Sequence, residues 1–413
     1  MLCGMERNFS YSPLILDLRH IPLQSNSFYL HRFSDNRFMI IGIPNETKPG
    51  ENRVSITPDV VKQFIKAGMQ VIVEEGAGLR SHFSNESYTA AGATVKSKIE
   101  VFSTADVICA VNAPAVNDIG LMKKEAVLIS YLFALSNPQM VEACATAGIT
   151  AFSVDAIPRI SRAQKMDALS SQANLAGYKA VLMAANTIGK IFPMMTTAAG
   201  TIRPCKVVIF GAGVAGLQAI ATAKRLGAVV EVTDIRPETK EQVESLGGKF
   251  IEVKSDDSVK IEGGYVKGVS EDFLRRQQEL VAKHVADADV VITTALIPGK
   301  KAPLLVTDEM VKSMRAGSVI VDMATEQGGN VQGSEMNKTV VKHNVTIIGE
   351  ANITSLLPSV ASDLYARNIF AFLTHLATKD GFKYEMEEEI TIGSMIAFKG
   401  QVVHPSLQKP VNA

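Results

Sequence analysis

The sequence predicts an α/β protein with two parallel-sheet domains. Short apolar runs alternate with amphipathic helical stretches from residue 39 onward, which is typical of parallel sheets. The 413 residues suffice for two or three domains of about 100–200 residues each. Hydrophobic residues make up 46% and charged residues 20% of the chain, and this balance excludes wholesale disorder.

Residues 1–38 differ from the rest because they mix aromatics, prolines and both charge signs without periodicity. We expect a disordered extension or an upstream start codon, with the fold beginning at Met39. The segment lacks the layout of a secretory signal. A transit peptide is an alternative, although Glu6, Asp17 and Asp35 depart from the acid-poor composition of such peptides.

The first α/β domain is predicted over residues 39–165. It opens with an apolar strand at 39–46, and residues 57–67 form a helix with a Thr cap and Pro at its first position. Further buried strands are expected at 69–78, 105–114 and 125–138.

The second domain is predicted over residues 166–352. A long helical stretch, about 164–191, links the two domains, and Met194 and Met195 after it are expected in the core. A short linker at 200–205 precedes strands that are expected at 206–210, 288–299, 317–324 and 344–352. Residues 353–413 should return to complete the first domain, which makes the second domain an insertion.

Composition also excludes several function classes. Lys+Arg and Asp+Glu are both 42, so the basic excess typical of nucleic-acid binders is missing. The four cysteines form no C-x-x-C pair, which disfavours a disulfide framework or structural zinc and suits a reducing compartment. The histidines show no metal-ligand spacing. No apolar run reaches the roughly 18–20 residues of a membrane span.

The strongest local motif is a glycine fingerprint, G-A-G-V-A-G, in which Gly211, Gly213 and Gly216 follow a predicted strand and open a helix. Such glycines provide a tight turn, close approach of a pyrophosphate and close helix packing, and the helix N-terminus attracts phosphate. The motif predicts a Rossmann-like dinucleotide site. A turn without ligand, S-adenosylmethionine or another nucleotide remain alternatives.

Asp234 ends the next predicted strand, where dinucleotide sites place a ribose-binding carboxylate. A carboxylate there would repel a 2′-phosphate and so favours NAD(H) over NADP(H). Arg236 points the other way, because a nearby Arg can accommodate that phosphate. We give Asp234 more weight because it holds the strand-end position.

A second polar cluster precedes the long helix, in residues 158–178. If this segment is helical from about residue 163, Gln164, Asp167 and Ser171 share one face and Ser170 borders it. These groups could hold a nicotinamide carboxamide at a domain junction, where ligands usually bind. An ordinary solvated helix start is the alternative.

Three segments together carry a family resemblance: IGIPNETKPGENRVSITP, RISRAQKMDALSSQANLAGYKA and FGAGVAGLQAIATAKRLGAVVEVTD. Over about residues 39–407 the chain resembles the NAD(H)-binding component of proton-translocating nicotinamide nucleotide transhydrogenase and, more distantly, alanine dehydrogenase. The resemblance implies a homodimer that passes hydride to NADP(H) on a separate subunit, with membrane-embedded subunits coupling the exchange to proton movement. We therefore expect a separate alpha chain, cytoplasmic and attached to the inner (plasma) membrane through its partners.

The resemblance also implies roles for individual residues. The nicotinamide and its ribose would be held by Arg159, Gln164, Asp167 and Ser170. The adenosine and phosphate side would be lined by Gly211, Gly213, Val214, Ala215, Gly216, Asp234, Ile235 and Arg236. Gly264 and Tyr265 match a mobile loop that closes over the nucleotide.

Departures from alanine dehydrogenase separate the two relatives. The resemblance implies that alanine dehydrogenases use an Arg, a Lys and a His for pyruvate. This chain keeps Arg53 but has Asn112 and Phe133 at the other two positions. Hydride transfer between two nicotinamides needs close placement rather than a proton donor, so the transhydrogenase role is favoured. An alanine-dehydrogenase-like oxidoreductase and a non-catalytic NAD(H)-binding module remain alternatives.

Overall fold

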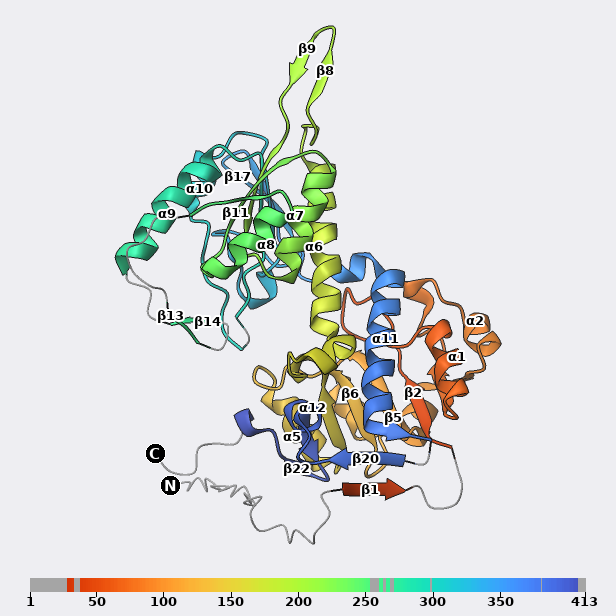
Figure 1. The fold of residues 1–413 in the computed structure, drawn as a ribbon. Coiled ribbons are helices and arrows are strands. Elements are labelled where there is room, and N and C mark those ends of the chain that lie inside the picture. Colours follow the sequence, from red (N-terminus) through yellow and green to blue (C-terminus); the bar gives the residue numbers. More distant parts are fainter. Residues whose placement is uncertain are drawn as a thin grey trace, which may run out of the picture.

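The computed structural model describes residues 28–32, 38–252, 260–262, 265–267, 271–297, 299–379 and 381–407. These residues form two α/β domains, and helix α6 (Ala168–Thr187) runs from one into the other (Figure 1). The predicted fold class is confirmed, because parallel strands dominate the main sheet of each domain. The chain returns to the first domain with α11 (Pro358–Leu376), so the second domain is inserted into the first.

The first domain contains an eight-stranded sheet in the order β22-β21-β7-β6-β5-β2-β3-β4. The strands β2 to β7 are parallel, whereas β21 and β22 add an antiparallel edge from the C-terminal part of the chain. Their bounds are β2 Ile40–Ile43, β3 Gln70–Glu74, β4 Thr94–Lys96, β5 Val107–Asn112, β6 Val127–Tyr131, β7 Thr150–Ser153, β21 Met395–Phe398 and β22 Gln401–Val402.

Helices cover both faces of this sheet. Helices α1 (Pro58–Lys66) and α11 share one apolar core with it, and α3 (Lys98–Thr104) and α5 (Pro138–Thr146) share the other. Pro58 begins α1 as predicted, and Thr57 holds the N-cap position without a side-chain cap bond. The smaller helices are α2 Asn85–Ala90, α4 Val116–Ile119 and α12 Glu389–Ser394.

The second domain contains a seven-stranded sheet in the order β12-β11-β10-β15-β16-β18-β17, parallel except for β17. The bounds are β10 Lys206–Phe210, β11 Val229–Thr233, β12 Lys249–Phe250, β15 Val290–Thr293, β16 Val319–Asp322, β17 Thr339–Lys342 and β18 Val345–Ile348. Side chains of a strand alternate between faces. In β10, Val207 and Ile209 join one core and Val208 and Phe210 join the other, so both faces are apolar, as a buried parallel sheet requires.

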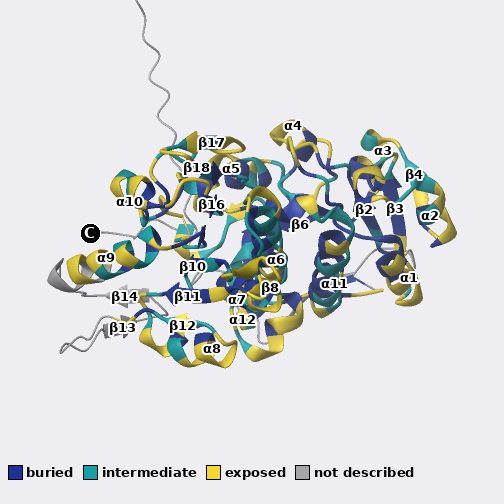
Figure 2. Ribbon diagram, turned by 90° about the horizontal axis from the view of Figure 1, so that it is seen from above, coloured by how far each residue is buried: buried dark blue, intermediate teal, exposed yellow. Residues whose placement is uncertain are grey.

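Helices again cover both faces. α6, α7 (Val214–Arg225) and α8 (Lys240–Ser245) lie on one face, and α9 (Glu271–Ala286) and α10 (Asp308–Ser313) lie on the other. Figure 2 shows the strands in dark blue and the outward faces of helices such as α8 and α1 in yellow. None of the helices in the described ranges combines the length and apolarity that a membrane crossing needs.

The segment after α6 differs from the prediction. Strands β8 (Met195–Thr197) and β9 (Gly200–Ile202) form an exposed hairpin that projects from the second domain (Figure 1), where a linker was expected. The expectation that Met194 and Met195 are core residues is wrong, because their side chains are 66% and 45% exposed. The hairpin carries them away from both sheets.

Part of the expected N-terminal extension also forms structure. Phe28–Arg32 is strand β1, which pairs antiparallel with β20 (Gly381–Glu385), and β19 (Ala377–Thr378) pairs with β20 on its other side. The rest of that extension lies outside the described residues, apart from Phe38. A further two-stranded ladder joins β13 (Lys260–Glu262) and β14 (Tyr265–Lys267).

Candidate functional site

The three fingerprint glycines lie in the turn between β10 and α7, and each meets a different constraint. Gly211 has φ +98°, a conformation that favours glycine. A Cβ on Gly216 would lie 1.8 Å from the Gly211 carbonyl oxygen, so α7 can pack against the turn only without a side chain there. A Cβ on Gly213 would meet nothing within 4 Å. The turn is therefore tight on its inner side and open at Gly213.

The open side coincides with the start of α7. Gly213 is the N-cap of α7 and provides no side-chain cap bond. The first N–H groups of a helix lack intrahelical partners and attract anions. The geometry thus fits a phosphate group at the turn, and a side chain at Gly213 would occupy that space.

A fourth glycine, which the sequence analysis did not single out, fixes the position of α7. A Cβ on Gly177 of α6 would lie 2.0 Å from the Ala215 carbonyl oxygen at the start of α7. A glycine inside a helical pattern was the available signal. Gly177 lies ten residues after Asp167, about 15 Å along the helix axis, so α6 connects the glycine turn with the second polar cluster.

Asp234 directly follows β11, and its carboxylate already has partners. Its Oδ2 accepts a hydrogen bond from the Ala212 N–H at 2.7 Å, which ties the glycine turn to the end of β11. Its Oδ1 accepts from the Arg236 N–H at 2.9 Å, and the Arg236 guanidinium donates to both oxygens at 3.1 Å. Arg236 therefore neutralises the carboxylate that the sequence analysis treated as a free acceptor, and ribose hydroxyls would have to compete with it.

Apolar side chains are exposed around this turn. Val214 and Ile235 are 40% and 49% exposed, and Leu296 after β15 is 49% exposed. Thr294, just before it, donates from Oγ1 to the Phe210 carbonyl at 3.0 Å and so holds the β15 loop against the turn. Sequence reasoning missed Leu296 and Thr294 because no short motif marks them.

The second cluster is arranged differently from the predicted helical face. Residues Ser161–Met166 form the 3₁₀ helix η4, and α6 begins only at Ala168, with Asp167 as its N-cap. Asp167 accepts hydrogen bonds from the Ser170 N–H at 2.8 Å and from the Ser170 hydroxyl at 2.6 Å. Such a cap ends the preceding turn, so Gln164, Asp167 and Ser171 do not share a helix face.

The four residues implied for the nicotinamide are therefore only partly assembled. Asp167 and Ser170 are in contact, whereas Arg159 and Gln164 are exposed on the segment before them. Gly264 lies outside the described residues. Tyr265 lies in β14 opposite Glu262, and its side chain is outside the described part of the structure.

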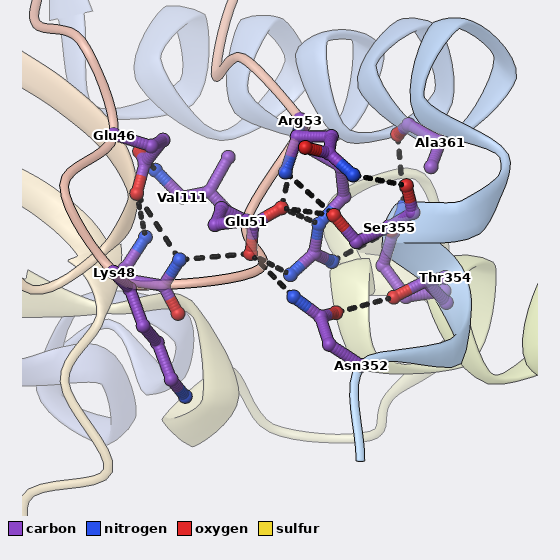
Figure 3. A network of polar contacts seen from close by, with 12 residues as sticks. Glu46, Lys48, Glu51, Arg53, Val111, Asn352, Thr354, Ser355 and Ala361 are labelled. Carbon is purple, nitrogen blue, oxygen red and sulfur yellow. Dashed lines mark hydrogen bonds and ion pairs between the residues drawn. The ribbon is translucent and has the colours of Figure 1, made fainter. Parts of the chain in front are cut away.

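A buried polar network in the first domain surrounds Arg53 (Figure 3). Arg53 donates from Nε and Nη2 to the two carboxylate oxygens of Glu51, at 2.8 and 2.6 Å, and from Nη1 to Gln172 Oε1 at 2.9 Å. Burial raises the pKa of Glu51, but the hydrogen bonds and charge of Arg53 outweigh it and lower that pKa to about 2. The Arg53 charge is thus balanced inside the protein.

Asn112 joins this network to a second buried carboxylate. Its Nδ2 donates to Glu46 at 3.1 Å and to Glu51 at 2.9 Å. Burial raises the pKa of Glu46 to about 7, although hydrogen bonds from Asn112 and Val111 oppose the shift. A Lys at position 112, as the alanine dehydrogenase resemblance implies, would instead add a cation, so this network is not arranged to receive a substrate carboxylate.

Comparisons with known proteins bear on this arrangement. Residues 42–176 match the family described as alanine dehydrogenase/PNT, N-terminal domain, and residues 180–405 match its C-terminal domain. The chain is 50% identical over 380 residues to the first polypeptide of the divided NAD(P) transhydrogenase subunit alpha of Rhodospirillum rubrum, covering 89% of this chain and 99% of that one. It is 31% identical to alanine dehydrogenase of Bacillus subtilis, covering 90% and 94%. A solved transhydrogenase structure from Sinorhizobium meliloti superimposes with a TM-score of 0.78 at 44% identity, covering 89% and 100%.

Proposed function

Because the chain belongs to the alanine dehydrogenase/PNT family, we propose that it is the NAD(H)-binding component of a proton-translocating NAD(P)⁺ transhydrogenase. In this role it transfers hydride between its own NAD(H) and NADP(H) bound on a partner subunit. The observation that carries the choice within the family is the closed Glu51–Arg53–Asn112 network beside an intact glycine turn. The dinucleotide site is retained, while the cation for a substrate carboxylate is occupied.

The residues act by placement. The N-terminus of α7 holds the pyrophosphate at Gly213, and Asp234 and Arg236 bind the adenosine ribose. Asp167 and Ser170, together with Gln164 and Arg159, position the nicotinamide. Direct transfer between two nicotinamides requires their C4 atoms at about 3–3.5 Å and no proton donor. Phe133 in place of a His is compatible with that requirement.

The partners follow from the same role. We propose that membrane-embedded subunits couple the transfer to proton movement and hold this chain at the cytoplasmic face of the membrane. The projecting hairpin offers Met194, Met195 and Ile202 as exposed apolar side chains, 66%, 45% and 44% exposed. An exposed apolar patch marks a protein contact, and we assign this one to a homodimer interface.

An alanine-dehydrogenase-like reaction is the second candidate, supported by the 31% identity to that enzyme and by the retained Arg53. A mixture of the purified chain, NADH, NADP⁺ and an NADP-binding transhydrogenase subunit tests the proposal, with pyruvate and ammonia replacing the last two in parallel. We expect NADH oxidation only in the first mixture. Oxidation with pyruvate would refute the proposal, and tight NADH binding without either reaction would favour a non-catalytic module.

A further inference from the structure

Tyr131, the last residue of β6, has a buried hydroxyl without a hydrogen-bond partner among the described residues. The residue is only 5% exposed. Two other buried tyrosines are satisfied: Tyr88 donates to the Ile56 carbonyl and Tyr365 to the Ala110 carbonyl, both at 2.8 Å. Buried polar groups are nearly always hydrogen-bonded, so the Tyr131 hydroxyl requires a partner from elsewhere.

The position of Tyr131 indicates where that partner would come from. Strand β6 lies between β5 and β7 in the middle of the first sheet, and Tyr131 stands at its carboxyl end. Ligands of open α/β sheets bind outside the carboxyl ends of the strands. The Tyr131 ring stacks on Phe133, with centroids 5.5 Å apart, and contacts Tyr365 of α11 at 5.4 Å.

Helix α11 connects Tyr131 with the cluster around Asp167. Tyr365 packs on Tyr131, and Asn368, three residues later on the same helix, accepts from the Ser171 hydroxyl at 2.7 Å. Asn368 also donates to the Lys165 carbonyl at 2.9 Å. Residues three apart lie on one helix face, so a single face of α11 holds both the Tyr131 ring and the segment that carries Asp167.

The charged groups near the hydroxyl are already engaged. Asp155 accepts from the N–H groups of Leu132 and Phe133, both at 3.2 Å, and Asp167 is held by Ser170. Burial raises the pKa of the Tyr131 hydroxyl, the Arg53 charge opposes this shift, and the Asp155 and Asp167 charges add to it. The phenol is therefore protonated at physiological pH and can donate a hydrogen bond.

The backbone beside Tyr131 is strained. Phe133 has φ +45° and is 49% exposed, and a bulky residue rarely adopts this left-handed conformation. Such strain persists where the surrounding structure imposes it and is concentrated at ligand sites. Here the bonds to Asp155 hold the strained turn and keep the Phe133 ring over Tyr131.

We propose that the Tyr131 hydroxyl positions the nicotinamide ring by hydrogen bonding to its carboxamide. This inference rests on the proposed function, because it assumes that NAD(H) binds with its nicotinamide near Asp167. Three carboxylates, Glu51, Asp155 and Asp167, act on the hydroxyl against one guanidinium, which disfavours a phosphate there and suits a neutral amide. An amide offers both an acceptor and donors to a phenol.

The test compares two ligands and two substitutions in the full chain. ADP-ribose lacks the nicotinamide but keeps the rest of the contacts, and Tyr88→Phe is the matched control, since it removes a satisfied buried hydroxyl outside the site. We expect Tyr131→Phe to weaken NADH binding about three- to tenfold and to leave ADP-ribose binding unchanged. Calorimetric titration measures both ligands, and NADH fluorescence can be followed without tryptophan background because the chain has no Trp.

The thermal behaviour of the ligand-free chain provides an independent readout. Tyr131→Phe removes an unpaired buried hydroxyl, so its melting temperature should equal or exceed that of the wild type, whereas Tyr88→Phe should melt lower with both affinities intact. Unchanged NADH affinity in Tyr131→Phe, or equal losses for NADH and ADP-ribose, would overturn the inference. A wild-type chain that binds ADP-ribose and NADH too weakly to detect would instead refute the proposed function.

Discussion

The contrast between Gly213 and Gly216 separates ligand binding from folding within a single turn. In Gly216→Ala the new Cβ would lie 1.8 Å from the Gly211 carbonyl oxygen, whereas real Cβ contacts are essentially never shorter than 3.0 Å. Helix α7 would have to move away from the turn by more than 1 Å, and such overpacking costs about 1–3 kcal/mol. In Gly213→Ala the Cβ meets nothing within 4 Å, and φ is −76°, so an alanine fits without strain.

The two variants should therefore differ in kind. Gly213→Ala should unfold in denaturant within about 0.5 kcal/mol of the wild type, yet bind NADH at least about tenfold more weakly, because its methyl group occupies the space that a phosphate would use. Gly216→Ala should lose both stability and affinity. Urea unfolding and NADH titration measure the two quantities. If Gly213→Ala bound NADH as the wild type does, the open side of the turn would not be the phosphate site; if Gly216→Ala were as stable as the wild type, the packing argument would fail.

Three further predictions concern other regions of the molecule. Because burial raises the pKa of Glu46 from 4.5 to about 7, the folded chain holds a proton that the unfolded chain loses between these values; stability should fall as pH rises from about 4.5 to 7, by up to about 3 kcal/mol, and urea unfolding of Glu46→Gln across this range should lack that dependence. Replacing Asp167 by Ala removes the α6 cap, which should cost about 0.5–2 kcal/mol and slow hydride transfer, whereas Ser170→Ala, which leaves the bond from the Ser170 N–H to Asp167, should cost less stability; equal unfolding curves for Asp167→Ala and the wild type would contradict the capping role. Polar substitution of Met195 and Ile202 in the hairpin should convert a dimer into monomers without lowering the melting temperature, since both side chains are exposed; analytical ultracentrifugation measures the mass, and an unchanged dimer would place the interface elsewhere.

Local features of the chain were predictable because their causes lie within a few residues. The glycine turn depends on contacts between Gly211 and Gly216 and on backbone conformations that few residues other than glycine adopt. The buried strands of both sheets are short runs of β-branched and other apolar residues, and their alternation with helices indicated parallel sheets. The start of α1 at Pro58 is equally local.

Other features required the tertiary structure, because they depend on segments far apart in the chain. Arg53 is engaged by Gln172, 119 residues away, and Ser171 by Asn368, 197 residues away. The exposure of Met194 follows from a hairpin that leaves the domain, although its composition alone suggested a core residue. Whether Tyr131 has a partner depends on which groups of β6, α6 and α11 meet around it.

The sequence by itself thus determined the fold class, the dinucleotide turn and the residues that distinguish the two branches of the family. The tertiary structure decided how the charges and hydroxyls are partnered: Asp234 with Arg236, Asp167 with Ser170, and Arg53 with Glu51. The physical reason is range. Backbone preference and apolar periodicity act between near neighbours in the chain, whereas a buried polar group takes whichever partner the packed elements bring within about 3 Å.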